Sequence, residues 1–177
     1  FDPAEALRAV MTAAQASRMQ ELPGLRYYDA ETDAAFRRTF LLLSDLRQEL
    51  AEETGQLSLH YQPKIDLVSG ECISAEALLR WNHPTLGMVS PGEFIPLAEA
   101  TALITPLTRF VLRRAAAGLA DWQERGVDLS LSVNISPANL AEPDFADNLL
   151  ARIDMAGVQR TRFELEFTEG VLNDNKE

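Results

Sequence analysis

Residues 57–81 read LSLHYQPKIDLVSGECISAEALLRW, and this stretch decides how the fold is interpreted. Hydrophobic and polar side chains alternate on both sides of a Val-Ser-Gly turn, as in β-strands, where successive side chains point to opposite faces. The pattern predicts two antiparallel strands, over residues 57–67 and 72–81. In the second strand Glu76 and Arg80 share one face, although apolar residues surround Glu76. A carboxylate in that setting needs a partner or a metal ion.

The remaining sequence alternates between helix and strand patterns. Capping and turn signals predict a short helix that begins with a capping box at Ser90, and longer helices over residues 105–126 and 144–156. Strands are predicted at residues 129–136 and 162–169. Strands separated by helices usually run parallel, with the helices as crossover connections. The sequence therefore predicts an α/β fold.

Each predicted strand is apolar on one face and polar on the other. Strands covered by helices on both faces are almost wholly apolar, whereas a barrel covered by helices outside can keep polar rows inside. Active sites of such barrels lie at the C-terminal ends of the strands. Asn134, Glu166 and Glu169 lie late in their strands, where Glu76 and Arg80 would meet them. Such a group suits hard divalent cations and a phosphate. An open sheet with one solvated face is the alternative.

Composition narrows the class of partner. The 177 residues include 16 basic and 27 acidic side chains, for a formal net charge of −11. This balance argues against a nucleic-acid polymer, which needs a basic surface. The single cysteine, Cys72, allows no internal disulfide and fits a cytoplasmic location. No apolar run is long enough to span a membrane, and the chain begins within helical sequence. We therefore expect a fragment, whose parent could be membrane-anchored upstream.

Two helices are predicted before the strand pair, over residues 3–20 and 32–52. The apolar stripe of the second consists of Phe36, Phe40, Leu43, Leu46 and Leu50. This helix either packs on a core or connects two domains. The acidic residues near its end, Glu49, Glu52 and Glu53, are expected to be solvated.

Five motifs carry a resemblance to a known family. The stretches YQPKIDL, AEALLRW, FIPLAE, SVNIS and LEFTE, in this order and spacing, strongly resemble the EAL-domain family of cyclic di-GMP phosphodiesterases. The resemblance runs from about residue 55 to the end of the chain and implies a TIM-like (β/α)8 barrel with an antiparallel first strand. The implied reaction is Mg²⁺- or Mn²⁺-dependent hydrolysis of cyclic di-GMP to the linear dinucleotide pGpG. Divalent metals promote such displacements by activating water and stabilising charge on phosphate oxygens.

The resemblance also implies roles for individual residues. The metal ligands would be Glu76, Asn134 and Glu166. The substrate contacts would be Gln62, Arg80 at a phosphate, and Pro96 near a guanine. Glu169 resembles the second acid of an E-x-T-E motif, which supports a loop near the metals; it and Glu76 are the residues we expect to matter most for catalysis.

The resemblance divides the chain into three parts. Residues 1–29 look like the C-terminal tail of a GGDEF domain, residues 30–54 like a connector helix, and residues 55–177 like the N-terminal half of an EAL domain. An unrelated helical extension is the alternative for the first part. Upstream, the parent would carry a GGDEF or sensor domain, and the chain would form a homodimer through the EAL domain, the connector or both.

Several motifs of the family are missing. A full barrel needs roughly 250 residues, and the paired aspartates, the lysine and the later glutamate and glutamine that complete the family's site are not in this sequence. We therefore expect the 177-residue chain alone to be catalytically incompetent, while its parent is a phosphodiesterase. The chain could be the ordered part of a larger protein, a truncation product, or a half completed by another chain. The alternative function is an inactive EAL domain that acts as a cyclic di-GMP receptor or regulatory module.

Overall fold

The computed structural model describes residues 30–167. The predicted helix over residues 3–20, the GGDEF-like stretch 1–29 and Glu169 lie outside the described residues. The chain divides into two compact units between Leu46 and Arg47. This division falls within helix α2 (Ala30–Glu52), so the last turns of α2 belong to the unit that carries the sheet. The predicted helix over residues 32–52 is confirmed.

The predicted apolar stripe of α2 is partly wrong. Leu46 is buried as expected, but Phe40 is 76% exposed, and the other fully buried leucine is Leu42. The reason is helix geometry: at about 100° per residue, position 40 lies about 120° around the helix from position 46. A stripe read at steps of three and four can therefore drift off the buried face.

The hairpin that opens the second unit matches the prediction. Strand β1 (Leu57–Ile65) pairs antiparallel with β2 (Cys72–His83), with Gln62 opposite Glu76. Strand β2 runs two residues further than predicted and folds back into the unpredicted strand β3 (Gly87–Val89). Gly87 has φ of 68°, in the left-handed region that glycine adopts at little cost.

Two parallel strands complete the sheet. Strands β4 (Ser130–Asn134) and β5 (Phe163–Glu166) follow in the order β1-β2-β4-β5, and the β2–β4 and β4–β5 pairs are both parallel. Strand β1 is therefore antiparallel to β2, β4 and β5, as the family resemblance implied. Both crossovers are helical, with α3 (Pro91–Glu99) and α4 (Ile104–Glu124) in the first and α5 (Pro137–Leu140) and α6 (Phe145–Met155) in the second, before a 3₁₀ turn at Arg160–Arg162. α5 and the 3₁₀ turn were not predicted.

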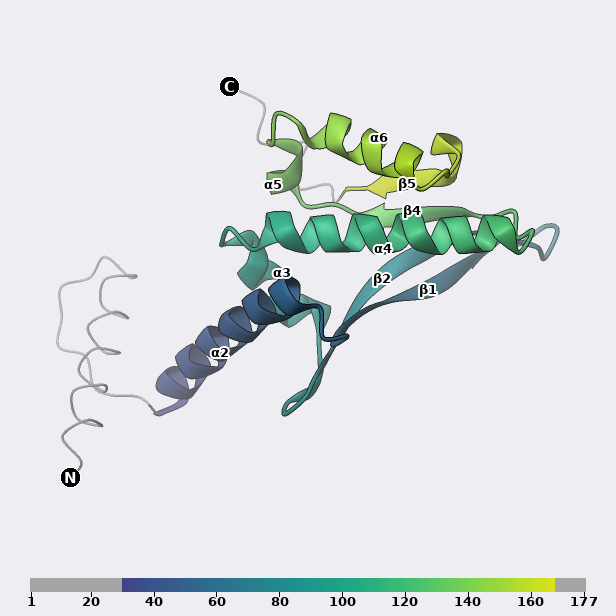
Figure 1. Cartoon of the computed structure of the whole chain (residues 1–177). Coiled ribbons are helices and arrows are strands. Elements are labelled where there is room, and N and C mark those ends of the chain that lie inside the picture. The colour runs from purple at the N-terminus through teal and green to yellow at the C-terminus, as the bar shows by residue number, and fades with distance from the viewer. Residues whose placement is uncertain (1–29, 168–177) are drawn as a thin grey trace, which may run out of the picture. The chain divides into compact units, whose positions relative to one another are not determined.

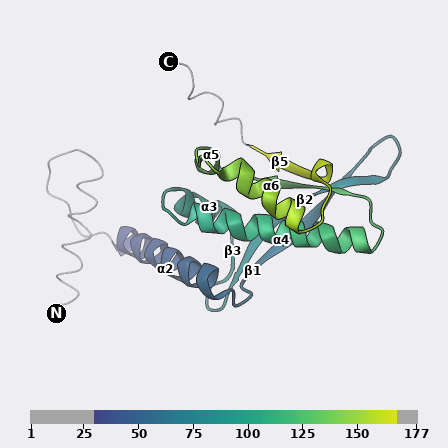
Figure 2. The same ribbon diagram turned by 45° about the horizontal axis from the view of Figure 1, so that its top comes forward.

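The helices cover the apolar face of the sheet. Figure 1 and Figure 2 show α4 and α6 side by side across the strands. The apolar row of β4 and most of that of β2 are buried on this face: Leu131, Val133 and Trp81 are each 0% exposed, and Trp81 packs against Phe94 of α3. Ile73, at the start of β2, is 56% exposed. Tyr61 of β1 packs edge-on against Trp122, with ring centroids 4.9 Å apart, and a methyl group added at Gly118 would overlap the Tyr61 hydroxyl. The parity prediction, with apolar rows toward helices, is confirmed.

The predicted capping box at Ser90 does not form. Ser90 is extended and occupies the N-cap position before Pro91, but its side chain makes no capping hydrogen bond. Instead, a backbone hydrogen bond closes the first turn: the N–H of Glu93 donates to the Ser90 carbonyl at 2.9 Å. A proline in the first turn already lacks an N–H that would need a partner.

The end of α2 is joined to β1 by Glu49, which is only 1% exposed. Its Oε1 accepts the N–H groups of Gly55, Gln56 and Leu57 at 3.1, 3.0 and 3.3 Å. Its Oε2 accepts the N–H of Thr54 at 3.1 Å and the hydroxyl of the same residue. The expectation that Glu49 is solvated is wrong, since the chain folds back over the helix end and supplies donors to this carboxylate.

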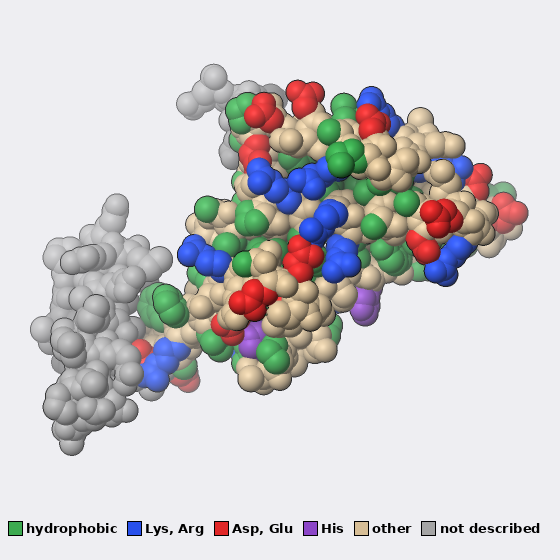
Figure 3. All heavy atoms as spheres, in the orientation of Figure 1, with side chains coloured by type: hydrophobic (Ala, Val, Ile, Leu, Met, Phe, Trp, Pro, Cys, Tyr) green, Lys and Arg blue, Asp and Glu red, His purple; other side chains and the backbone are tan. Residues whose placement is uncertain are grey.

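Basic side chains gather over α4 on the face shown in Figure 3. Arg113 and Arg114 lie over the Phe110 ring, with guanidinium carbons 5.7 and 5.4 Å from its centroid, and Arg113 pairs with Glu53.

None of the helices in the described range is long and apolar enough to cross a membrane.

Candidate functional site

The sheet face opposite the helices carries the polar rows of all four main strands. The register places Glu76 beside Gln62 and Ser132, and places Asn134 beside Glu166. Opposed residues in a sheet point to the same face, so these side chains share one surface. Asn134 and Glu166 are the last residues of β4 and β5, at the C-terminal ends where barrel active sites lie.

Glu76 and Asn134 are in direct contact. The Asn134 amide Nδ2 donates to Glu76 Oε1 at 2.6 Å, although the two residues are 58 positions apart in sequence. Strands β2 and β4 are adjacent and parallel, and Asn134 lies two residues beyond Ser132, the residue opposite Glu76, so the two side chains meet diagonally across the strand pair. The sequence prediction that these residues meet is supported by this contact.

Glu166 is held by a residue to which the sequence assigned no role. Lys64 of β1 pairs with Glu166 Oε1 and donates to Ser132 Oγ at 2.9 Å. The hydrogen bond to Glu166 raises the pKa of Lys64, and the hydrogen bonds from Lys64 and Ser132 lower the pKa of Glu166. Lys64 and Glu166 are therefore both charged near neutral pH. The signal in the sequence was parity, since Lys64 shares the face of Gln62.

The Lys64–Glu166 pair shows that the sheet curls toward its polar face. β1 and β5 are the two ends of the path β1-β2-β4-β5. With strands about 4.8 Å apart, three spacings separate them by about 14 Å across a flat sheet, and the register displaces Glu166 from Lys64 by four residues, about 13 Å, along the strands. That combined distance is longer than extended lysine and glutamate side chains can span. An ion pair between them therefore brings the outer strands toward each other across a concave polar surface. An open, flat, solvated sheet does not have this geometry.

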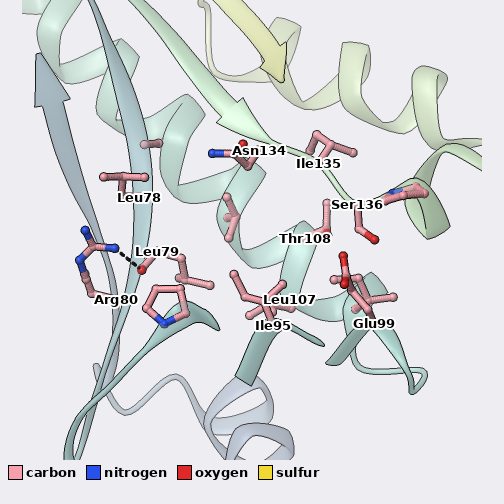
Figure 4. A pocket seen from close by; sticks show the side chains of 15 residues that line it. Leu78, Leu79, Arg80, Ile95, Glu99, Leu107, Thr108, Asn134, Ile135 and Ser136 are labelled. Atoms are coloured by element: carbon pink, nitrogen blue, oxygen red, sulfur yellow. Dashed lines mark hydrogen bonds between the residues drawn. The ribbon is translucent and has the colours of Figure 1, made fainter. Parts of the chain in front are cut away.

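Arg80 is one of the residues that line a cavity beside this surface. The cavity has a volume of about 260 Å³ and lies between the ends of β2 and β4 and helices α3 and α4 (Figure 4). Its wall is mostly apolar, from residues such as Ile95 and Leu107, with Glu99, Thr108 and Ser136 as polar groups. Arg80 Nη1 donates to the carbonyl of Leu79 at 2.9 Å, which fixes the guanidinium beside its own strand.

The other predicted site residues fall in different places. Gln62 is exposed on β1 directly opposite Glu76. Pro96 is exposed on α3 and does not line the cavity, whereas its neighbour Ile95 does. Glu169 lies outside the described residues.

The donor chemistry at Glu76, Asn134 and Glu166 fits a hard divalent cation. Two carboxylates and an amide carbonyl are oxygen ligands, and Mg²⁺ is commonly held by one or two carboxylates together with waters and substrate phosphates. Within residues 30–167 no group of three or more His, Cys, Asp and Glu side chains could hold a metal ion. A metal here would therefore depend on the Asn134 amide, and Glu166 would meet it while paired with Lys64.

A family model described as EAL domain matches residues 43–177. The cyclic di-GMP phosphodiesterase PA2567 of Pseudomonas aeruginosa is 45% identical over 166 residues, which are 94% of this chain and 28% of that protein. The chain thus spans little more than a quarter of this curated relative.

Solved structures share the fold. The PaMucR phosphodiesterase in its c-di-GMP complex is 38% identical with a TM-score of 0.71, over 76% of this chain and 54% of that one. The FimX EAL domain of Xanthomonas citri in complex with c-diGMP is 29% identical with a TM-score of 0.68, over 78% and 53%. The predicted fold, an α/β sheet of EAL type with an antiparallel first strand, is confirmed as a partial sheet.

Proposed function

The chain belongs to the EAL domain family, and from that premise we propose that it supplies the N-terminal half of a catalytic barrel that hydrolyses cyclic di-GMP to pGpG. One observation carries the proposal: Glu76 and Asn134 share a hydrogen bond on the polar face, with Glu166 next to Asn134 in register. Asn134 and Glu166 are the last residues of their strands, at the end where a barrel enzyme binds its substrate, and Glu76 of the adjacent strand β2 reaches Asn134. The relatives named as cyclic di-GMP phosphodiesterases support the choice of substrate.

Glu76, Asn134 and Glu166 would hold the divalent metal, Mg²⁺ or Mn²⁺. When bound, the metal supplies stabilisation of the charge that develops at the phosphate during hydrolysis. Glu76 already accepts a hydrogen bond from Asn134, which sets the position of one carboxylate oxygen before the metal arrives. Glu166 is likewise held by Lys64 and Ser132. Ligands that are oriented in advance need less rearrangement when a metal binds.

The substrate would be held by groups around the cavity. Arg80 is four residues from Glu76 on the same strand face, so its guanidinium can contact a phosphate beside the metal, in the paired geometry that arginine favours. Gln62, opposite Glu76, would add a polar contact from the first strand. We assign Pro96 to a guanine contact and Glu169 to support of the metal-site loop. Both assignments rest on the family motif.

The test separates metal binding from substrate binding in the natural protein that carries this chain. Glu76→Gln should abolish turnover of cyclic di-GMP at any substrate concentration. Arg80→Ala should raise KM by at least about tenfold, because it removes a charge-assisted phosphate contact. The matched control is Glu71→Gln, an exposed acid in the turn of the same hairpin, which should change neither parameter. Turnover that survived Glu76→Gln would refute the metal assignment.

The proposal also covers the domains around the EAL barrel, the oligomeric state and the location of the protein. We assign residues 1–29 to the end of a GGDEF domain and α2 to a connector that leads from it into the EAL barrel. A dimer through the EAL domain or the connector and a cytoplasmic location are further parts of this proposal. The helical form of α2 supports the connector role, since a helix transmits orientation between domains better than a flexible linker.

A further inference from the structure

Lys64 supplies a positive charge among the acidic side chains of the polar face. Lys64 is the only lysine within residues 30–167, and its ammonium group lies among the carboxylates of this face. It pairs with Glu166, donates to Ser132, and interacts electrostatically with Glu76 and Glu164 as well. The face therefore contains its own cation, next to two residues proposed as ligands of another cation.

Lys64 and a metal would share one carboxylate. The Lys64 ammonium donates a hydrogen bond to Oε1 of Glu166, and the side chains of Lys64 and Glu166 remain 39% and 37% exposed. A metal ion can therefore reach Glu166, but it must either share the carboxylate with the ammonium or displace it. A fixed positive charge near a divalent cation opposes binding, and the effect is large where water is partly excluded.

We propose that Lys64 is a positioning residue that holds Glu166 in the metal-free protein and, through its charge, weakens the binding of divalent metal. This inference rests on the proposed metal site. In the metal-free protein, Lys64 offsets the repulsion between the acids of the polar face, because it bridges β1 to β5 across the concave surface. When a metal ion supplies that positive charge, the lysine becomes a competitor for the same oxygen.

The experiment measures Mn²⁺ affinity by the loss of the free-ion electron paramagnetic resonance signal, in the natural protein that carries this chain. Lys64→Met should lower the Kd for Mn²⁺ by at least about tenfold, because the competing charge is gone. Lys64→Gln, which keeps a polar group, should also tighten binding and serves if the methionine variant folds poorly. Lys64→Arg, which keeps the charge, should stay within about threefold of the unmodified protein.

Arg125→Gln is the control for a general effect of net charge on Mn²⁺ binding. Arg125 pairs with Asp121 one turn earlier at the exposed end of α4, so its loss changes the net charge by the same amount away from the polar face. This variant should bind Mn²⁺ as the unmodified protein does. A gain in affinity equal to that of Lys64→Met would show a nonspecific charge effect and overturn the proposal.

The failures can be told apart. If Glu76→Gln leaves the Kd for Mn²⁺ unchanged, the metal site itself is wrong, and the proposed function and the role of Lys64 fall together. If Glu76→Gln weakens binding while Lys64→Met leaves the Kd unchanged or raises it, the metal site stands and the proposed competition is wrong. A raised Kd would further show that Lys64 supports the metal-bound form of Glu166. A purely structural lysine would not give tighter binding when removed.

Discussion

Replacing Glu49 tests the junction between α2 and β1. Glu49→Ala removes the acceptor of four backbone N–H groups, those of Thr54, Gly55, Gln56 and Leu57, together with the acceptor of the Thr54 hydroxyl. The site is buried, since Glu49 is 1% exposed. Removing one partner leaves the remaining buried groups unsatisfied, which is more costly than losing the bond alone.

The size of the stability loss in Glu49→Ala depends on how many of the freed N–H donors can hydrogen-bond to water instead. A hydrogen bond to a charged group contributes about 1.5–3 kcal/mol. The N–H groups of Thr54, Gly55 and Gln56 belong to residues near the surface, so water can replace the lost acceptor. The N–H of Leu57 belongs to a residue that is only 3% exposed. We therefore expect Glu49→Ala to lower the free energy of unfolding by about 3 kcal/mol, well short of the sum over all donors. Glu49→Gln should lower it by about half as much, since one carbonyl oxygen remains.

The assay is urea unfolding followed by circular dichroism, with Glu52→Ala as the matched control. Glu52 lies on the same helix end but is exposed, and its carboxylate accepts a hydrogen bond from Gln48 one turn earlier. Its loss should therefore change stability by less than about 0.5 kcal/mol. If Glu49→Ala and Glu52→Ala lowered the unfolding free energy equally, the buried carboxylate would not hold this junction.

Three further predictions concern stability. Burial raises the pKa of Glu49, but the hydrogen bonds from Thr54, Leu57, Gly55 and Gln56 outweigh it and hold the pKa below its usual value. The stabilisation from Glu49 is therefore complete above the unfolded pKa and lost as the pH falls through the lower folded pKa, so the stability difference between the unmodified chain and Glu49→Gln should shrink in urea titrations carried from neutral to acidic pH. Gly118→Ala should lower the unfolding free energy by about 1–2 kcal/mol, because overlap with the Tyr61 hydroxyl outweighs the better helix propensity of alanine; in a double-mutant cycle the loss should be smaller in a Tyr61→Phe background, and equal losses would contradict the contact. Trp81→Ala should lower the unfolding free energy by about 3–5 kcal/mol, because Trp81 is fully buried, donates to Gln56 at 3.2 Å and meets Phe94 edge-on; a value under about 1 kcal/mol in the same urea assay would contradict its place in the core.

The contact between Glu76 and Asn134 could be predicted from the sequence because it depends on local rules. Strand parity put both side chains on the polar face, and the helix between the strands made β2 and β4 parallel. These rules fix which face a residue occupies and which end of a strand it lies near. They do not give the curvature of the sheet, and the pair between Lys64 and Glu166, at the two sheet edges, depends on that curvature.

The errors have a similar cause. Glu49 looks solvated by helix rules, and its burial depends on a loop that folds back after the helix has ended. Strand β3 is only three residues long, too short for an alternating pattern to be recognised. Phe40 was placed on the buried face of α2 because hydrophobic spacing alone does not show which of two overlapping stripes is covered.

The most direct test of the central claim is product analysis of cyclic di-GMP incubated with the natural protein that carries this chain, with Mg²⁺ or Mn²⁺ and with excess chelator. The proposed site at Glu76, Asn134 and Glu166 predicts linear pGpG when metal is present and intact cyclic di-GMP when it is chelated. Binding of cyclic di-GMP without any linear product, in saturating metal, would contradict the phosphodiesterase assignment and indicate a receptor.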